Sequence, residues 1–249
     1  MGGFANNAPI VTDGLVFYVD AGNGLSYPSS GGTWNDLVGG NNGSFNNMDD
    51  VNNPSNNYDS ANGGSIVFDG VDDYAATLLD ESSFNFNTHS FSIWIKISSS
   101  TSTEPFGFLN TGSTTAWRFS INKISFDDTN DPGNVAFWSR DPSGNRFAFD
   151  FNPGVNDGDW HNIVFVFNSI SSNSATVYYD GSSVSITKTR LENPSLGSTS
   201  YPFWIGGSNN RGSLLRPLDG NIAQIKIYNR ALSSTEILQN YNALKNRFI

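Results

Sequence analysis

The chain is a succession of short segments in which apolar and polar residues alternate, and turn residues separate these segments. The clearest is Phe91–Ile97 (FSIWIKI), where four apolar residues fall on one face and Ser92, Trp94 and Lys96 fall on the other. A period of two is the pattern of a β-strand with one buried face. Strands of this kind are predicted at 14–20, 43–45, 65–68, 74–78, 91–97, 116–121, 135–139, 146–151, 161–168, 175–180, 183–187, 203–206 and 221–228. Many short strands joined by turns predict an antiparallel β-sandwich or barrel.

The composition agrees with an all-β fold and excludes several function classes. The chain has 19 Phe, 9 Tyr and 6 Trp for a strand-built core, and 25 Gly and 10 Pro for turns. It has no Cys, so a disulfide and a thiolate zinc site are both excluded. The net charge of −10 repels phosphate backbones, which argues against nucleic acid as a partner.

One helix is predicted near the C-terminus. Ser233 and Glu236 have the spacing of a capping box, in which each side chain accepts a backbone N–H of the first turn. An apolar stripe at helical spacing follows, made of Ile237, Leu238, Tyr241 and Leu244. We therefore expect a helix over 234–245 that packs on the sandwich.

The remaining organisation is simple. Residues 1–13 are predicted to be a polar N-terminal arm, and residues 14–249 a single domain that includes the helix, because no Pro/Gly-rich linker separates two cores. No apolar run approaches the roughly 20 residues that cross a bilayer, so membrane insertion is not expected. The segment 1–13 has no basic stretch followed by an apolar core, so it is not expected to be a secretory signal.

Three groups of segments, in this order and spacing, carry a resemblance. They are GLVFYVDAGN and WNDLVGGNNG at Gly14–Asn23 and Trp34–Gly43, SIVFDGVDDYA at Ser65–Ala75, and the C-terminal run of Asp157–Phe167, Val177–Ser182 and Gly220–Phe248. Together they resemble the laminin-G-like, concanavalin A-like lectin/glucanase jelly rolls, of the branch found in bacteriophage structural proteins and bacterial surface proteins. The resemblance implies two curved antiparallel sheets packed face to face. It also implies ligand recognition, commonly of glycans, by loops or a concave face.

The resemblance further implies a structural calcium ion, because many relatives bind one. One turn of this chain holds three carboxylates, at Asp69, Asp72 and Asp73. Clustered carboxylates suit Ca²⁺, which takes six to eight oxygen ligands, although a plain Asp-Gly turn with solvated acids is the alternative. In calcium-binding relatives an acid on the first strand, here Asp20, shares an ion with an acid on the last strand. Here that last strand carries Ala223 and Gln224 where acids are expected.

Sugar binding needs aromatic faces that stack on the rings and planar polar groups that bond the hydroxyls. The candidate ligand-binding residues are Trp117, Arg118, Trp138, Arg140, Asn209, Asn210 and Arg211. The alternative is that the strand tryptophans are core residues, since most strand tryptophans are buried. Leu214 and Leu215, in the polar loop Gly207–Pro217, are alternatively an anchor onto a neighbouring subunit.

No catalytic residues are predicted. Glycosidases on this kind of fold need two paired carboxylates, and Glu occurs only at 81, 104, 192 and 236, without the required pairing on one strand. Trp160-His161 opens a strand after a turn, where a structural role is expected.

The sequence therefore predicts a non-catalytic recognition or adhesion module, on a virion surface or otherwise extracellular. Its expected partners are a glycan or cell-surface polysaccharide, virion capsid or tail proteins, and further copies of itself. The alternatives are a purely structural decoration or assembly protein without sugar binding, and a carbohydrate-active enzyme.

Overall fold

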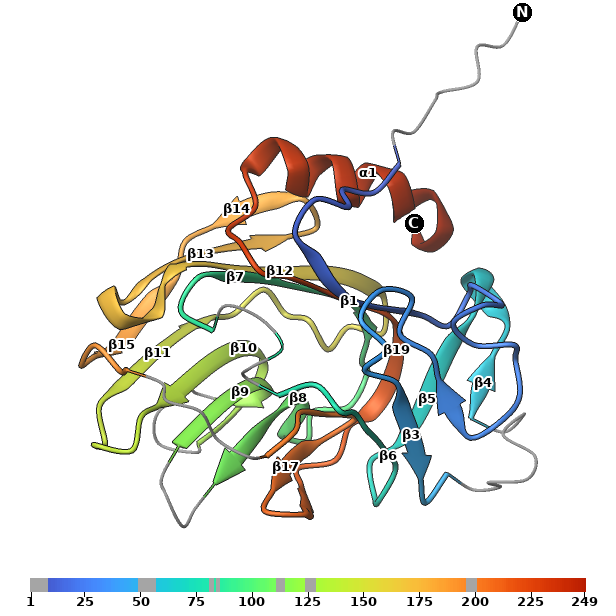
Figure 1. Ribbon diagram of the computed structural model, residues 1–249, viewed down its shortest axis with the longest axis horizontal. Coiled ribbons are helices and arrows are strands. Elements are labelled where there is room, and N and C mark those ends of the chain that lie inside the picture. Colours follow the sequence, from blue (N-terminus) through green and yellow to red (C-terminus); the bar gives the residue numbers. More distant parts are fainter. Residues whose placement is uncertain are drawn as a thin grey trace, which may run out of the picture.

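A computed structural model describes residues 9–48, 57–80, 83, 86–110, 115–123, 129–195 and 201–249. In this part of the chain two β-sheets pack face to face, and one α-helix lies on the outside (Figure 1). All strand pairs are antiparallel except β17 with β8. The predicted all-β antiparallel sandwich with a C-terminal helix is confirmed.

The first sheet has eight strands in the order β14-β13-β12-β7-β19-β5-β4, and β1 also pairs with β19. Its strands are β1 (Leu15–Asp20), β4 (Tyr58–Asp59), β5 (Ser65–Asp69), β7 (His89–Lys96), β12 (Trp160–Ser169), β13 (Ser174–Tyr179), β14 (Ser182–Val184) and β19 (Asp219–Tyr228). Two short 3-10 helices adjoin it, at η2 (Ala61–Gly63) and η3 (Ile170–Ser172).

The second sheet has eleven strands in the order β15-β11-β10-β9-β8-β16-β6-β3-β2, with the β17–β18 hairpin attached to β8. Its strands are β2 (Thr33–Trp34), β3 (Gly43–Asn46), β6 (Tyr74–Ala76), β8 (Thr103–Asn110), β9 (Thr115–Lys123), β10 (Asn130–Arg140), β11 (Arg146–Phe151), β15 (Thr187–Leu191), β16 (Trp204–Ile205), β17 (Ser208–Asn210) and β18 (Ser213–Leu215).

The main core fills the space between the two sheets and is largely aromatic. Phe91 and Phe165 of the first sheet face Phe119 of the second, with ring centroids 5.3 to 6.1 Å apart. These residues follow the period of two, so each strand contributes every second side chain to the core. The intervening side chains of each strand point away from the core, and those of the second sheet form the candidate site.

The helix α1 (Ser234–Phe248) packs on the outer side of the eight-stranded sheet, across β7 and β12 (Figure 1). It begins at the predicted capping box, with both Ser233 and Glu236 bonded as expected. It runs three residues beyond the predicted end, because Phe248 stacks on Trp94 of β7 with ring centroids 4.4 Å apart. Among the described residues, no helix has the length and hydrophobicity needed to cross a bilayer.

Part of the predicted N-terminal arm lies against this helix. The Val11 backbone N–H donates to the Asn240 side chain at 2.8 Å, and the Val11 carbonyl accepts from the Tyr228 hydroxyl at 3.0 Å. Val11 is buried. Residues 9–13 therefore pack on the domain, whereas residues 1–8 lie outside the described residues.

The strand β8 is absent from the sequence prediction, because its residues include Pro105 and Gly107. The register between β8 and β9 shifts between Thr103 and Phe106, so Pro105 lies in an irregular stretch of the ladder. A proline lacks the N–H that a regular ladder needs, and a bulge removes that requirement. The same irregular stretch carries Glu104, which is important for the site.

Candidate functional site

The outward face of the eleven-stranded sheet carries a group of arginines around one tryptophan. Neighbouring strands place Arg118 of β9 opposite Trp138 of β10, and Arg190 of β15 opposite Ala148 of β11. On the next row, Arg140 of β10 lies opposite Arg146 of β11. We call five residues the arginine–tryptophan face: Arg118, Trp138, Arg140, Arg146 and Arg190.

The indole of Trp138 is the aromatic centre of this face. The Arg118 guanidinium lies over it, 5.1 Å from the ring centroid, in a cation–π contact. Ala136 and Ala148, its neighbours on the same face, have short side chains and are fully buried beneath the longer ones. Trp138 itself is half-buried, so part of the indole remains open to solvent.

Arg140 and Arg146 form a pair of like charges in direct register. Opposed residues of an antiparallel pair have Cβ atoms about 4.5 to 5.5 Å apart, and like charges there are destabilising. The Arg140 side chain makes no hydrogen bond or ion pair within the described residues, and its buried Nε lacks a partner there. The sequence analysis missed Arg146 and Arg190. The five-residue turn Asp141–Asn145, which separates Arg140 from Arg146, could have revealed their pairing.

A buried carboxylate holds Arg118 in place. Glu104 is 0% exposed and accepts two hydrogen bonds from Arg118, one of them from Nε at 2.9 Å. Arg216 donates to the same carboxylate at 2.9 Å, and the Lys123 ammonium lies 3.8 Å away. Burial alone would raise the pKa of Glu104, but Arg118, Arg216 and Lys123 outweigh burial, and the pKa is lowered. Glu104 is therefore an ionised anchor for Arg118, the arginine that contacts Trp138.

The structure places Trp117 away from the predicted ligand site. Its side chain is 1% exposed and points into the core, between Phe91 and Phe137, with ring centroids 5.5 and 5.2 Å away. A sugar cannot reach a ring in that position, so its predicted ligand-binding role does not fit the structure. The physical reason is strand alternation: Trp117 and Arg118 are neighbours, and only one of them can face outward.

The predicted polar loop is the β17–β18 hairpin, whose turn is Arg211-Gly212 with positive φ at both residues. Asn209 is buried and closes this hairpin, since it donates to the Pro202 carbonyl and accepts from the Gly212 N–H, both at 2.8 Å. Asn210 is half-buried and Arg211 is exposed.

This hairpin borders the arginine–tryptophan face. The register places Asn210, Leu109, Ala116 and Arg140 on successive strands. The span from Asn210 to Arg140 is three strand spacings, roughly 14 Å. Leu214 and Leu215 are half-buried within the hairpin rather than exposed, which weakens the alternative of an apolar anchor.

Asp69, Asp72 and Asp73 lie together, with one carboxylate oxygen of each within 4.8 Å of the others. Asp69 accepts from the Val71 and Asp72 N–H groups, and buried Asp73 accepts from the Asn57 side chain at 3.0 Å. The donors are hard oxygens, which suit Ca²⁺. The same hydrogen bonds also make a stable turn without an ion, so the geometry fits both alternatives.

Asp20 lies elsewhere. It pairs with Gln224 of β19, five residues along that strand from the partner of Asp69, which corresponds to roughly 16 Å. Its carboxylate accepts from the Arg247 guanidinium at 2.6 Å and from the Gln224 amide at 2.9 Å. The arginine supplies the positive charge that an ion would bring. The predicted metal role of Asp20 therefore does not fit this arrangement.

Residues 69–238 match the family model described as the concanavalin A-like lectin/glucanases superfamily. The chain belongs to this superfamily. The match runs from the last residue of β5 into the first turns of α1, so it includes the arginine–tryptophan face and the acidic turn.

Several solved structures share the fold of this concanavalin A-like domain. The botulinum neurotoxin serotype D binding domain aligns with TM-score 0.62 and 14% identity over 92% of this chain and 51% of its own. Trypanosoma rangeli sialidase in complex with the inhibitor DANA aligns with TM-score 0.59 and 15% identity over 94% of this chain and 33% of its own. The CBM40 of Ruminococcus gnavus IT-sialidase aligns with TM-score 0.51 and 12% identity over 70% of this chain and 96% of its own.

These likenesses concern the fold alone, because all three identities are low. The chain spans about half of the neurotoxin domain and about a third of the Trypanosoma sialidase. No curated protein matches the sequence.

Two pockets of this concanavalin A-like domain lie away from the arginine–tryptophan face. The larger, of about 440 Å³, lies beside the end of α1 and is lined by Lys96, Asp159, Trp160 and His161, among others. His161 bridges Asp157 and Asp180 at 3.1 and 2.8 Å. Burial alone would lower the pKa of His161, but the two carboxylates outweigh burial and raise it. His161 of β12 therefore connects this strand to the turns that carry Asp157 and Asp180.

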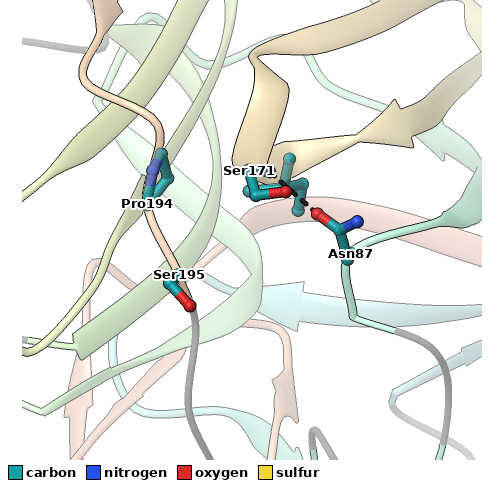
Figure 2. A pocket seen from close by; sticks show the side chains of 5 residues that line it. Asn87, Ser171, Pro194 and Ser195 are labelled. Carbon is teal, nitrogen blue, oxygen red and sulfur yellow. Dashed lines mark hydrogen bonds between the residues drawn. The ribbon is translucent and has the colours of Figure 1, made fainter.

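The smaller pocket, of about 120 Å³, lies where β15 ends beside η3. Figure 2 shows Asn87 and Ser171 facing each other on one side, with Pro194 and Ser195 on the other. The Asn87 side chain accepts from the Ser171 N–H at 2.8 Å. With no charged or aromatic lining residue, this pocket offers little for recognition of a ligand.

Proposed function

We propose that this domain is a non-catalytic carbohydrate-binding module whose site is the arginine–tryptophan face. The observation that carries the proposal is the half-buried Trp138, which lies against the Arg118 guanidinium on the outward side of the sheet. An indole offers a large apolar surface for the C–H face of a sugar ring, and guanidinium groups bond hydroxyls and acidic groups. Binding residues on strands are held more precisely than binding residues on loops.

The comparisons are compatible with this proposal. A neurotoxin binding domain and a sialidase CBM40 share the fold, so the architecture serves binding in other proteins. Glu104, a glutamate at this face, is unsuited to acid catalysis. Its lowered pKa and its ion pairs make it a poor proton donor.

We expect Trp138→Ala to weaken glycan binding about 30-fold, because a central tryptophan of a binding site contributes about 2 kcal/mol or more. Isothermal titration calorimetry, with ligands chosen from a glycan array, measures this change. Trp138→Phe, which keeps an aromatic ring, is the matched control and should retain most of the affinity. Binding that survives Trp138→Ala unchanged would exclude this face, and polysaccharide cleavage by the protein would favour the enzyme alternative.

We also propose a structural Ca²⁺ at Asp69, Asp72 and Asp73. Calcium at about 100 times its dissociation constant should stabilise the fold by about 2.7 kcal/mol, or roughly 5 to 10 °C in melting temperature. Asp72→Asn should abolish this shift, because exposed Asp72 contributes charge but its carboxylate makes no hydrogen bond to the described residues. Asp159→Asn, at another exposed acid, is the control. If calcium does not change the melting temperature of the wild type, the three aspartates form a plain turn and bind no ion.

The proposed setting is the outside of a virion or a bacterial cell, with capsid or tail proteins as neighbours. It rests on the resemblance of the sequence segments to phage structural proteins and bacterial surface proteins. Genes for capsid or tail proteins beside the gene for this chain would support the virion setting. Genes for cytoplasmic metabolism in that place would count against it.

A further inference from the structure

The distribution of charge on this domain is uneven. The whole chain has 13 Lys and Arg against 23 Asp and Glu, so a random patch of surface should be acidic. The arginine–tryptophan face instead gathers four of those 13 cations on four consecutive strands of one sheet, and Glu104 neutralises only Arg118 among them directly. Among the outward positions of β9 to β11 that the structure describes, Asp150 is the one carboxylate. The face is therefore a cationic surface on an acidic protein.

The spacing of the arginines on this face fits one shared ligand. Arg140 and Arg146 are directly opposed. Arg190 of β15 lies opposite Ala148, so it is the diagonal neighbour of Arg146. Diagonal neighbours on a sheet are about 7 to 8 Å apart, within reach of long side chains. Two or three guanidinium groups can therefore approach the same acidic substituent.

The burial of these arginines strengthens their attraction for an anion. Arg140, Arg146 and Arg190 are each half-buried, and the buried Nε of Arg140 has no partner among the described residues. A guanidinium that has lost part of its water binds a carboxylate or sulfate strongly, because its planar N–H groups match two oxygens at once.

We propose that the ligand of this face is an acidic glycan, in which a sugar ring packs on Trp138 and a carboxylate or sulfate group binds Arg140 and its neighbours. This inference rests on the proposed carbohydrate-binding function and adds the class of ligand. The acidic group is the determinant of selectivity, and the ring contact contributes affinity shared by neutral sugars.

The test compares polymers that differ only in charge. Calorimetry is carried out with polygalacturonate and its methyl ester, and with dextran sulfate and dextran. We expect an acidic polymer whose acidic group suits this face to bind at least about ten-fold more tightly than its neutral counterpart. Binding in the first pair only identifies a carboxylate, and binding in the second pair only identifies a sulfate; either result supports the proposal.

Two variants separate specific recognition from general attraction. Arg140→Ala should weaken binding of the acidic polymer about ten-fold or more. Lys245→Ala, on α1 beyond the opposite sheet, removes the same charge and should leave the affinity unchanged. Circular dichroism and the melting temperature verify that both variants are folded. Arg118 is not used for this test, because it is bound to buried Glu104.

The remaining outcomes overturn one proposal or the other. In one outcome, acidic and neutral polymers bind with equal affinity, Arg140→Ala has no effect, and Trp138→Ala weakens binding. This outcome overturns the proposal of an acidic ligand and leaves the carbohydrate-binding function intact. If Lys245→Ala and Arg140→Ala lose affinity equally, the attraction is long-range electrostatics, and the proposal of a specific acidic ligand is overturned as well. If none of the polymers and no glycan of the array binds, the proposed function itself fails.

Discussion

Replacement of Trp117 by alanine should lower the free energy of unfolding by about 3 to 5 kcal/mol, which is the usual cost of removing a large aromatic ring from a core. Trp117 is 1% exposed and contacts rings from both sheets. The rings with centroids within 6.2 Å are those of His89, Phe91, Phe106, Phe137, Phe167 and Phe203. Neighbours from two sheets cannot close such a cavity without moving strands, so little of the loss will be recovered.

Thermal unfolding monitored by circular dichroism measures this effect, and the melting temperature should fall by roughly 10 °C. Trp138→Ala is the matched control, because it removes the same side chain from the outward face of the neighbouring strand. That variant should cost about 1 kcal/mol while losing ligand affinity. A Trp117→Ala protein that melts like the wild type but no longer binds sugar would reverse the assignment of the two tryptophans.

The second large effect is expected at Glu104. Its replacement by glutamine leaves the Arg118 guanidinium, which is 7% exposed, without its counter-charge. Breaking a buried ion pair from one side costs about 3 to 5 kcal/mol, since the remaining charge stays buried. Urea unfolding at neutral pH should show this loss. Glu236→Gln, at the partly exposed carboxylate of the capping box, is the control and should cost about 1 kcal/mol.

The Glu104–Arg118 ion pair also predicts that the free energy of unfolding depends on pH. The pKa of Glu104 is lowered in the folded state, so its contribution to stability is complete above the unfolded value of about 4.5. That contribution is lost as the pH falls from there through the folded pKa. Unfolding curves measured between neutral and acidic pH should therefore converge for the wild type and Glu104→Gln. Curves that stay parallel across this range would show that folding does not change the pKa of Glu104.

Much of the fold could be predicted because most strands obey one local rule. The segment Phe91–Ile97 alternates and is found in β7, and the capping box at Ser233 begins α1. The predicted strand at 183–187 was wrong in one respect. The chain there leaves one sheet and enters the other, as β14 and then β15, and no local pattern marks such a crossing.

The site could be predicted only in part, because register is a property of two strands. Arg118, Trp138 and Arg140 are recognisable from residue type, but their meeting on one face depends on how β9 and β10 align. A shift of one residue would exchange Trp117 for Arg118 at the surface. Glu104 could not be found by alternation at all, since it lies in the irregular stretch beside Pro105.

The ends of the two sheets also affect how this domain behaves when many copies are crowded together. The eight-stranded sheet ends in β14 and β4, of three and two residues, and the eleven-stranded sheet ends in β2, of two residues, and in β15. Two further edges lie off these paths: three-residue β18, and β1, whose Tyr18 backbone is bonded by Asp36 and Leu37. β15 carries Lys188 and Arg190, and charged or very short edge strands resist the addition of another strand. Dense arrays of the domain should therefore remain discrete folded units, and any association between copies must use side chains rather than continuous sheets.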